Sequence, residues 1–156
     1  MISQLSTLKY KIVKVDPVSY SVNVPDDFIY NKASHKVSGE SSVRLEVDST
    51  AERIKCIVEF KLNCGNRGSE ELKMQFFTLK SVSIFKLENL ESYFINGKQD
   101  IDESILNIFF KISMNHARGM QSVVLKGTQL SRFLIPDVDF KPDPGSVNED
   151  EVLSAR

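Results

Sequence analysis

Few residues in this 156-residue chain have the types and spacing that catalysis or metal binding needs. His35 lies in a polar segment with no cysteine or acid at metal-ligand spacing, and His116 lies in a predicted helix beside Arg118. We expect surface or structural roles for both histidines. Asp137 and Asp139 flank one residue and project to the same side of an extended backbone. Paired acids can transfer protons, so a small enzyme or ligand-binding domain that uses Asp137, Asp139 and His116 is an alternative function.

The two cysteines, Cys56 and Cys64, lie in or near one predicted strand. A strand rises about 3.3 Å per residue, so eight residues separate the two thiols by more than a disulfide can bridge. Without a second pair of cysteines, a zinc site is not expected. The sequence also lacks a P-loop, a G-x-S-x-G motif and a dinucleotide-binding fingerprint. We therefore expect buried free thiols, no cofactor, no metal ion and no enzymatic activity.

The composition narrows the class of protein. A net charge of -1 gives no indication of a nucleic-acid partner. No segment approaches the roughly 20 apolar residues that span a membrane, and the first residues do not resemble a signal peptide. We expect a cytoplasmic domain in residues 1–141, long enough to form a core. Residues 142–156 are rich in proline and acidic residues, so we expect a disordered acidic tail there.

Four segments alternate between apolar and polar residues, as half-buried strands do. Pro17 lies inside the first of them, which indicates an edge strand or a bulge. Residues 28–39 are expected to form a loop, and the turn residues at 65–69 predict a hairpin. The four predicted strands are residues 9–24, 43–47, 53–64 and 72–85.

A long amphipathic helix is predicted after the strands. From Ile105 onward, apolar residues recur at three- and four-residue steps. Asp102 and Ser104 are suitable N-caps, and Gly127 tolerates the positive φ that commonly ends a helix. Residues 130–140 then predict an extended, apolar crossover that cannot continue the helix.

This order of elements predicts an α+β fold. Four sequential strands favour an antiparallel sheet, and a long C-terminal helix would pack on one face with the crossover and a possible short second helix. In the fourth strand Phe76 points to one face by alternation, and Phe77 and Leu79 point to the other. A sheet that buries one face does not need apolar residues on both. We therefore expect Phe77 and Leu79 to contact a second layer or a partner.

Several residues follow the pattern of a known family. They are His116, Ala117, Arg118, Gly127, Thr128, Pro136, Val138, Asp139 and Phe140, together with Ile84, Phe85 and Leu87 upstream and the stretch 18–25 near the N-terminus. In these positions the chain resembles the SecB family of chaperones. The fit needs a shift of one residue between the Gly-Thr turn and the proline. The resemblance covers residues 8–140 and is a pattern rather than a strict motif.

The resemblance implies an ATP-independent holdase that binds unfolded or aggregation-prone polypeptide in a hydrophobic groove. It also implies a homotetramer built as a dimer of dimers, with Arg118 and Met120 at a subunit contact. Substituting Phe77 or Val138 with Ser should then weaken the anti-aggregation activity and leave the fold intact. The implied groove residues are Phe77, Leu79, Val82, Phe85, Leu134, Val138 and Phe140.

Departures from the family pattern indicate which kind of chaperone this is. Export chaperones of the family dock the SecA motor through acidic residues on the exposed sheet. The matching positions here hold Ser19, Asn23 and Thr78, so SecA binding is doubtful. We therefore favour the branch of the family that holds an antitoxin within toxin-antitoxin-chaperone systems. Delivery of preproteins to SecA is the alternative within the family.

Overall fold

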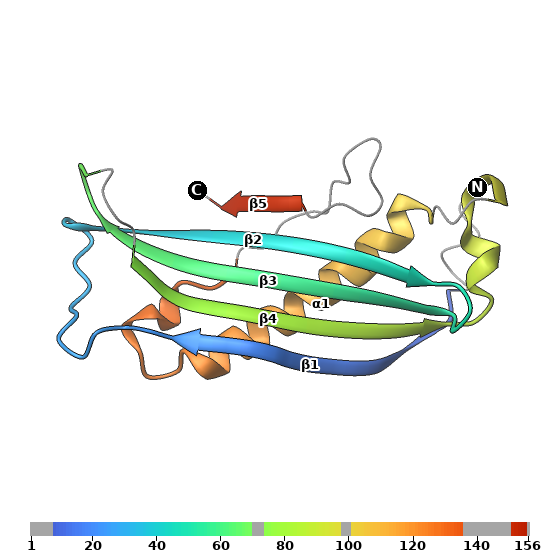
Figure 1. Cartoon of the computed structure of the whole chain (residues 1–156), viewed down its shortest axis with the longest axis horizontal. Coiled ribbons are helices and arrows are strands. Elements are labelled where there is room, and N and C mark those ends of the chain that lie inside the picture. The colour runs from blue at the N-terminus through green and yellow to red at the C-terminus, as the bar shows by residue number, and fades with distance from the viewer. Residues whose placement is uncertain (1–7, 70–73, 98–100, 136–150, 156) are drawn as a thin grey trace.

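The chain forms one antiparallel sheet with a long helix across one face (Figure 1). The computed structural model describes residues 8–69, 74–97, 101–135 and the backbone of 151–155. The strand order is β1-β4-β3-β2-β5. The elements are β1 (Tyr10–Val22), β2 (His35–Asp48), β3 (Arg53–Asn66), β4 (Met74–Leu87), the 3₁₀ turns η2 (Leu90–Tyr93) and η3 (Ile95–Gly97), the helix α1 (Glu103–Val124), η4 (Gln129–Arg132) and β5 (Glu151–Ala155).

The predicted α+β architecture, with an antiparallel sheet and a long C-terminal helix, is confirmed. The structure adds a fifth strand, because β5 pairs with residues 39–43 of β2. These five residues belong to the segment 142–156, and their backbone lies at the edge of the sheet beside β2. The division into a domain and a tail stays a prediction.

β2 is longer than the sequence indicated. It begins at His35, inside the segment expected to be a loop, and pairs residue by residue with β3 from His35–Asn66 to Asp48–Arg53. The polar and small residues at 35–42 carry no clear alternation, so pairing with β3 rather than local propensity makes this segment a strand.

β1 is an edge strand, and its pairing with β4 is irregular. The register shifts between Ile12 and Lys14 and again between Pro17 and Ser19. The predicted edge or bulge at Pro17 is therefore confirmed. Because proline cannot donate to a ladder, an edge position next to a register shift accommodates it.

The core lies between α1 and the inward rows of β2, β3 and β4. The predicted inward row of β3 is confirmed, since all its members are buried: Ile54, Cys56, Val58, Phe60 and Leu62. Asp102 caps α1 by accepting a hydrogen bond from the Ser104 backbone N–H at 2.8 Å, as predicted. Gly127 follows the helix with φ 82°. None of the described helices is long and apolar enough to cross a membrane.

A bulge in β4 changes the direction of its aromatic side chains. Leu62 pairs with Phe77 but Asn63 pairs with Gln75, which leaves Phe76 without a partner on β3. Phe76 is buried beside the Phe28 ring, with 4.7 Å between the ring centroids. Simple alternation therefore fails at this position, because a bulge inserts one extra residue into the ladder.

Candidate functional site

The structure places three of the predicted groove residues in the core under α1. Phe77 and Phe85 are 0% exposed and Leu79 is 2% exposed. Phe85 lies against Phe109 of α1, with 4.6 Å between the ring centroids. Phe77 and Leu79 were expected to contact a second layer or a partner, and in the described structure α1 forms that second layer. Contact of these residues with a client stays a prediction, and it would require displacement of α1.

The other predicted groove residues do not form one surface with these three. Val82 lies on the opposite face of the sheet, where it is the register partner of Ile57. Leu134 is 42% exposed just after η4. Val138 and Phe140 lie outside the described residues, as do the candidate acids Asp137 and Asp139.

An apolar row on β1 stays exposed, although its first member, Tyr10, meets the Phe109 ring of α1 edge to face at 5.2 Å. Tyr10, Ile12, Tyr20 and Val22 pair with Leu87, Phe85, Leu79 and Phe77, the inward residues of β4. This position in the register puts them on the face that carries α1, yet all four are exposed, as are the neighbouring Val13 and Val18. Figure 1 shows β1 at the margin of the sheet, away from the middle of α1. The uncovered apolar surface is therefore at the edge strand, and we call these six residues the β1 row.

Some apolar residues of α1 are not fully buried. Ile112 and Met120 are half-buried and pack against the core, and Val123 near the helix end is exposed. Arg118 is also half-buried. The predicted role of Arg118 and Met120 in a subunit contact stays a prediction, and their partial exposure leaves both side chains accessible to a second subunit.

Gln121 fixes the backbone that leaves η4. Its side chain is fully buried on α1. The amide Nε2 donates to the carbonyl oxygen of Phe133 at 2.7 Å, and Oε1 accepts from the backbone N–H of Ile135 at 2.7 Å. A glutamine side chain thereby supplies the donor and acceptor that a neighbouring strand would supply. The start of the crossover is consequently held against the helix.

Gln129 ties the β1–β2 loop to η4 in the same way. Its Nε2 donates to the carbonyl of Phe28 at 2.6 Å, and its Oε1 accepts from the Tyr30 N–H at 2.5 Å. The Tyr30 and Phe133 rings meet edge to face at 5.2 Å. We call residues 28–35 together with residues 128–135 the loop–turn junction, because these two segments lie far apart in the sequence and meet here.

Replacing Gln121 with Leu should destabilise the fold without a change in volume large enough to open a cavity. The substitution leaves the buried Ile135 N–H and the Phe133 carbonyl without their partners, which costs about 1–3 kcal/mol per group. Urea unfolding should therefore show a free energy of unfolding at least about 2 kcal/mol lower. Gln129→Leu, at an exposed position, is the matched control and should cost less. Equal losses in the two variants would contradict the role assigned to Gln121.

A polar contact joins α1 to β4 inside the molecule. His116 Nδ1 lies 3.0 Å from Ser83 Oγ, and Ser83 is buried. Partial burial lowers the pKa of His116 below the ordinary value of 6.5, because desolvation disfavours the imidazolium. The histidine therefore links helix to sheet in its neutral form.

Stability should fall when the pH drops below about 6.5. The folded state binds a proton on His116 less tightly than the unfolded state does. Protonation of His116 at low pH therefore favours the unfolded state. The stabilisation is complete at neutral pH and is lost as the pH falls from the unfolded pKa through the lower folded pKa. Thermal unfolding between pH 8 and pH 5 measures it. His116→Gln should have a flatter profile over this range, and an unchanged profile would contradict the assignment.

The remaining reactive groups do not form a catalytic or metal site in the described residues. Cys56 and Cys64 are buried free thiols, as predicted. Burial raises the pKa of the Cys56 thiol to about 12, so it is protonated and unreactive at neutral pH. Among the residues that the structure describes, no three histidine, cysteine or carboxylate side chains gather as metal ligands.

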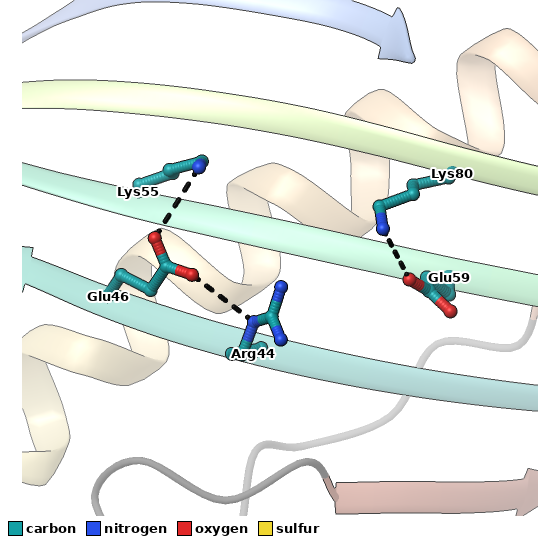
Figure 2. A network of polar contacts seen from close by, with 5 residues as sticks. All are labelled: Arg44, Glu46, Lys55, Glu59 and Lys80. Atoms are coloured by element: carbon teal, nitrogen blue, oxygen red, sulfur yellow. Dashed lines mark ion pairs between the residues drawn. The ribbon is translucent and has the colours of Figure 1, made fainter. Parts of the chain in front are cut away.

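The face of the sheet opposite α1 is lined with ion pairs (Figure 2). Glu46 binds both Arg44, at 3.3 Å, and Lys55, at 3.4 Å, while Lys80 and Glu59 pair at 2.9 Å across two strands. These exposed pairs contribute little stability each. The carboxylates that they use are already matched by cations, so this part of the face presents no cluster of free acids.

Comparison with known proteins identifies the fold. The chain is similar to the SecB-like chaperone of Mycobacterium tuberculosis, whose structure is known in complex with a ChAD peptide from the HigA1 antitoxin. The TM-score is 0.56, and the match covers 86% of this chain and 93% of that chain at 11% sequence identity. The fold is SecB-like. No protein-family profile and no curated protein matches the sequence.

The SecB-like fold agrees with the resemblance seen in the sequence. The accessible apolar surface, however, lies on β1 and not at Phe77 and Leu79 of β4. The sequence did not indicate the β1 row, because residues 9–24 alternate only loosely and assign no residue to a covered or an open face. A signal was present in Pro17, which marks β1 as an edge strand that a single helix need not reach. The loop–turn junction carried no local signal, since its contacts join residues about 100 positions apart.

Proposed function

We propose that this protein is a chaperone that holds non-native polypeptide without using a nucleotide. The observation that carries the proposal is the β1 row, a run of exposed apolar side chains along one margin of a SecB-like sheet. Burial of apolar surface is favourable by about 25 cal/mol per Å² and requires no particular sequence in the bound chain. Binding the unfolded chain lowers its free concentration and so opposes its aggregation.

The proposed client is an antitoxin of a toxin-antitoxin-chaperone system. Two observations support this choice over export. The similar mycobacterial chaperone is bound to an antitoxin peptide. In addition, Ser19, Asn23 and Thr78 stand where acidic residues would dock SecA, and Thr78 Oγ1 lies 2.6 Å from Ser21 Oγ in a neutral contact.

We also propose that the protein works in the cytoplasm as a homotetramer, a dimer of dimers. The β1 row supplies an exposed apolar surface for one subunit contact, and the exposed Val123 near the end of α1 lies on a second element that could supply another. Because a strand edge has unpaired backbone groups, β1 is suited to pairing with another strand. Arg118 and Met120 are then placed at the helix contact.

Light scattering of a chemically unfolded client, diluted with and without this protein, tests the proposal. Near-stoichiometric protein should suppress aggregation without ATP. An antitoxin encoded next to this gene should be held more tightly than SecA. If aggregation proceeds unchanged at a severalfold excess of the protein, the holding function is wrong. If SecA binds tightly and the antitoxin does not, the export role replaces the proposed one.

A further inference from the structure

The outer edge of β2 is only partly covered by β5. Figure 1 shows β5 outside β2, at the margin of the sheet opposite β1. β2 is 14 residues long, and every one of them has a register partner on β3. β5 is 5 residues long and pairs antiparallel with residues 39–43 of β2. Among the described strands, β3 is therefore the only partner of residues 35–38 and 44–48.

β2 is a more regular strand than β1 at the other margin of the sheet. The ladder between β2 and β3 runs without a register shift, and β2 contains no proline. β1 carries Pro17 and shifts register twice against β4. A regular edge presents an unbroken row of backbone N–H and C=O groups, which can pair with an extended chain of any sequence. β2 therefore offers an added strand a longer ladder than the one that β5 uses.

Two physical effects oppose each other at this edge. β5 has the advantage of a tether, because residues 136–150 connect it to α1 and η4. A tethered partner binds as if it were present at a high concentration, about millimolar for a short linker. A separate strand has the advantage of length, because each residue that pairs beyond positions 39–43 adds ladder contacts that β5 does not make. Displacing β5 has a fixed cost, so only a sufficiently long segment can overcome it.

We propose that β5 is a built-in competitor for the β2 edge and sets a minimum length for the client segment that binds there. The occupant is an extended segment of non-native polypeptide, which displaces β5 and pairs antiparallel with β2 as β5 does. This inference rests on the proposed holding function and adds a second binding surface to the β1 row. Because the pairing uses the backbone, this surface selects clients by length and not by sequence.

A pair of proline substitutions removes the competitor from the full-length chain. Successive residues of a strand direct their N–H groups to opposite edges, so Val152→Pro combined with Leu153→Pro removes a donor from the edge that faces β2. Val152→Ala combined with Leu153→Ala keeps both donors and is the matched control. Among the described strands β5 neighbours β2 alone, so circular dichroism should show that both variants stay folded. Either proline substitution by itself is the milder replacement if the double variant unfolds.

Labelled peptides of two lengths measure the competition. Peptides of about 6 and about 14 residues, with the same alternating apolar composition, are titrated with each protein and followed by fluorescence anisotropy. If β5 leaves the edge free about one tenth of the time, its removal tightens binding about tenfold. Both peptides should therefore bind the proline variant about tenfold more tightly than the unaltered protein or the alanine variant. The long peptide should bind every variant more tightly than the short one.

Methylation of the peptide backbone separates strand addition from side-chain contact. A long peptide with N-methyl groups on two adjacent central residues keeps its side chains and lacks one donor on each of its edges. It should bind the unaltered protein about tenfold more weakly than the unmethylated peptide, because one lost donor faces β2. This comparison uses the unaltered protein and so does not depend on the folding of a variant.

Several results would overturn the inference. Equal affinities in the unaltered protein and the folded proline variant would show that β5 does not compete. Equal binding of the methylated and unmethylated peptides would exclude strand addition. A proline variant that sediments as a larger species and gains no affinity for peptides would show that a second copy takes the edge instead. If all variants suppress aggregation equally and peptide length has no effect, this inference fails and the proposed function stands. If no variant holds a client or a peptide, both fail.

Discussion

Replacing Phe77 with Ser is expected to unfold the protein, or nearly so. Phe77 is fully buried and pairs with Leu62 across the β3–β4 ladder. Truncating a buried Phe to Ala costs about 3–5 kcal/mol, and Ser adds a hydroxyl that needs a partner in an apolar site. Single domains are stable by only about 5–15 kcal/mol. The sequence alone predicted the opposite result, a folded chain with weakened holding activity.

Urea unfolding followed by circular dichroism measures this effect. Met74→Ser is the matched control, because Met74 lies on the same strand and is exposed. Surface substitutions usually change the free energy of unfolding by less than about 0.5 kcal/mol. A Phe77→Ser protein with the unfolding midpoint of the unaltered protein would contradict the burial described here. It would also restore Phe77 as an accessible groove residue.

Placing a charge in the β1 row should abolish holding and assembly while the subunit stays folded. Tyr20→Asp and Ile12→Asp put a carboxylate on the exposed apolar margin, where contact with a client or a second subunit would bury it. Burying an unpaired charge costs several kcal/mol. In the isolated subunit both positions are exposed, so the loss of stability should stay within about 1 kcal/mol.

Sedimentation and light scattering separate the two consequences. The variants should sediment as smaller species than the unaltered protein and should fail to suppress aggregation. Ser19→Asp is the control, because it adds the same carboxylate to β1 opposite Lys80, on the face away from α1. If Tyr20→Asp and Ile12→Asp assemble and protect clients as well as Ser19→Asp does, the β1 row is not the working surface.

Local patterns in the sequence were sufficient for the regular parts of the fold. The strict alternation of residues 53–64 predicted which side chains of β3 face the core, because β3 is a central strand and its inward row lies under the helix. The bounds of α1 followed from Asp102 at the start and Gly127 at the end, since caps act within a single turn. Pro17 identified an irregular edge strand before any pairing was known.

The placement of the candidate site depended on the tertiary structure. One extra residue at Phe76 shifts the pairing in β4, and no local pattern marks such a bulge. The sequence located the excess apolar surface on β4, but α1 covers that strand and leaves the β1 row exposed. A single helix is about 10–12 Å across and strands are about 4.8 Å apart, so it cannot cover a whole sheet. The position at which the helix packs on the sheet decides which strand stays uncovered.

The sequence by itself determined the class of fold, the inward face of β3 and the bounds of the helix, because these depend on residues close together along the chain. Only the tertiary structure decided which apolar residues are exposed and brought Arg132 onto Tyr30 beside Gln129. Contacts between residues about 100 positions apart arise from the packing of the helix end against the β1–β2 loop. The side chains on either segment do not encode that packing locally.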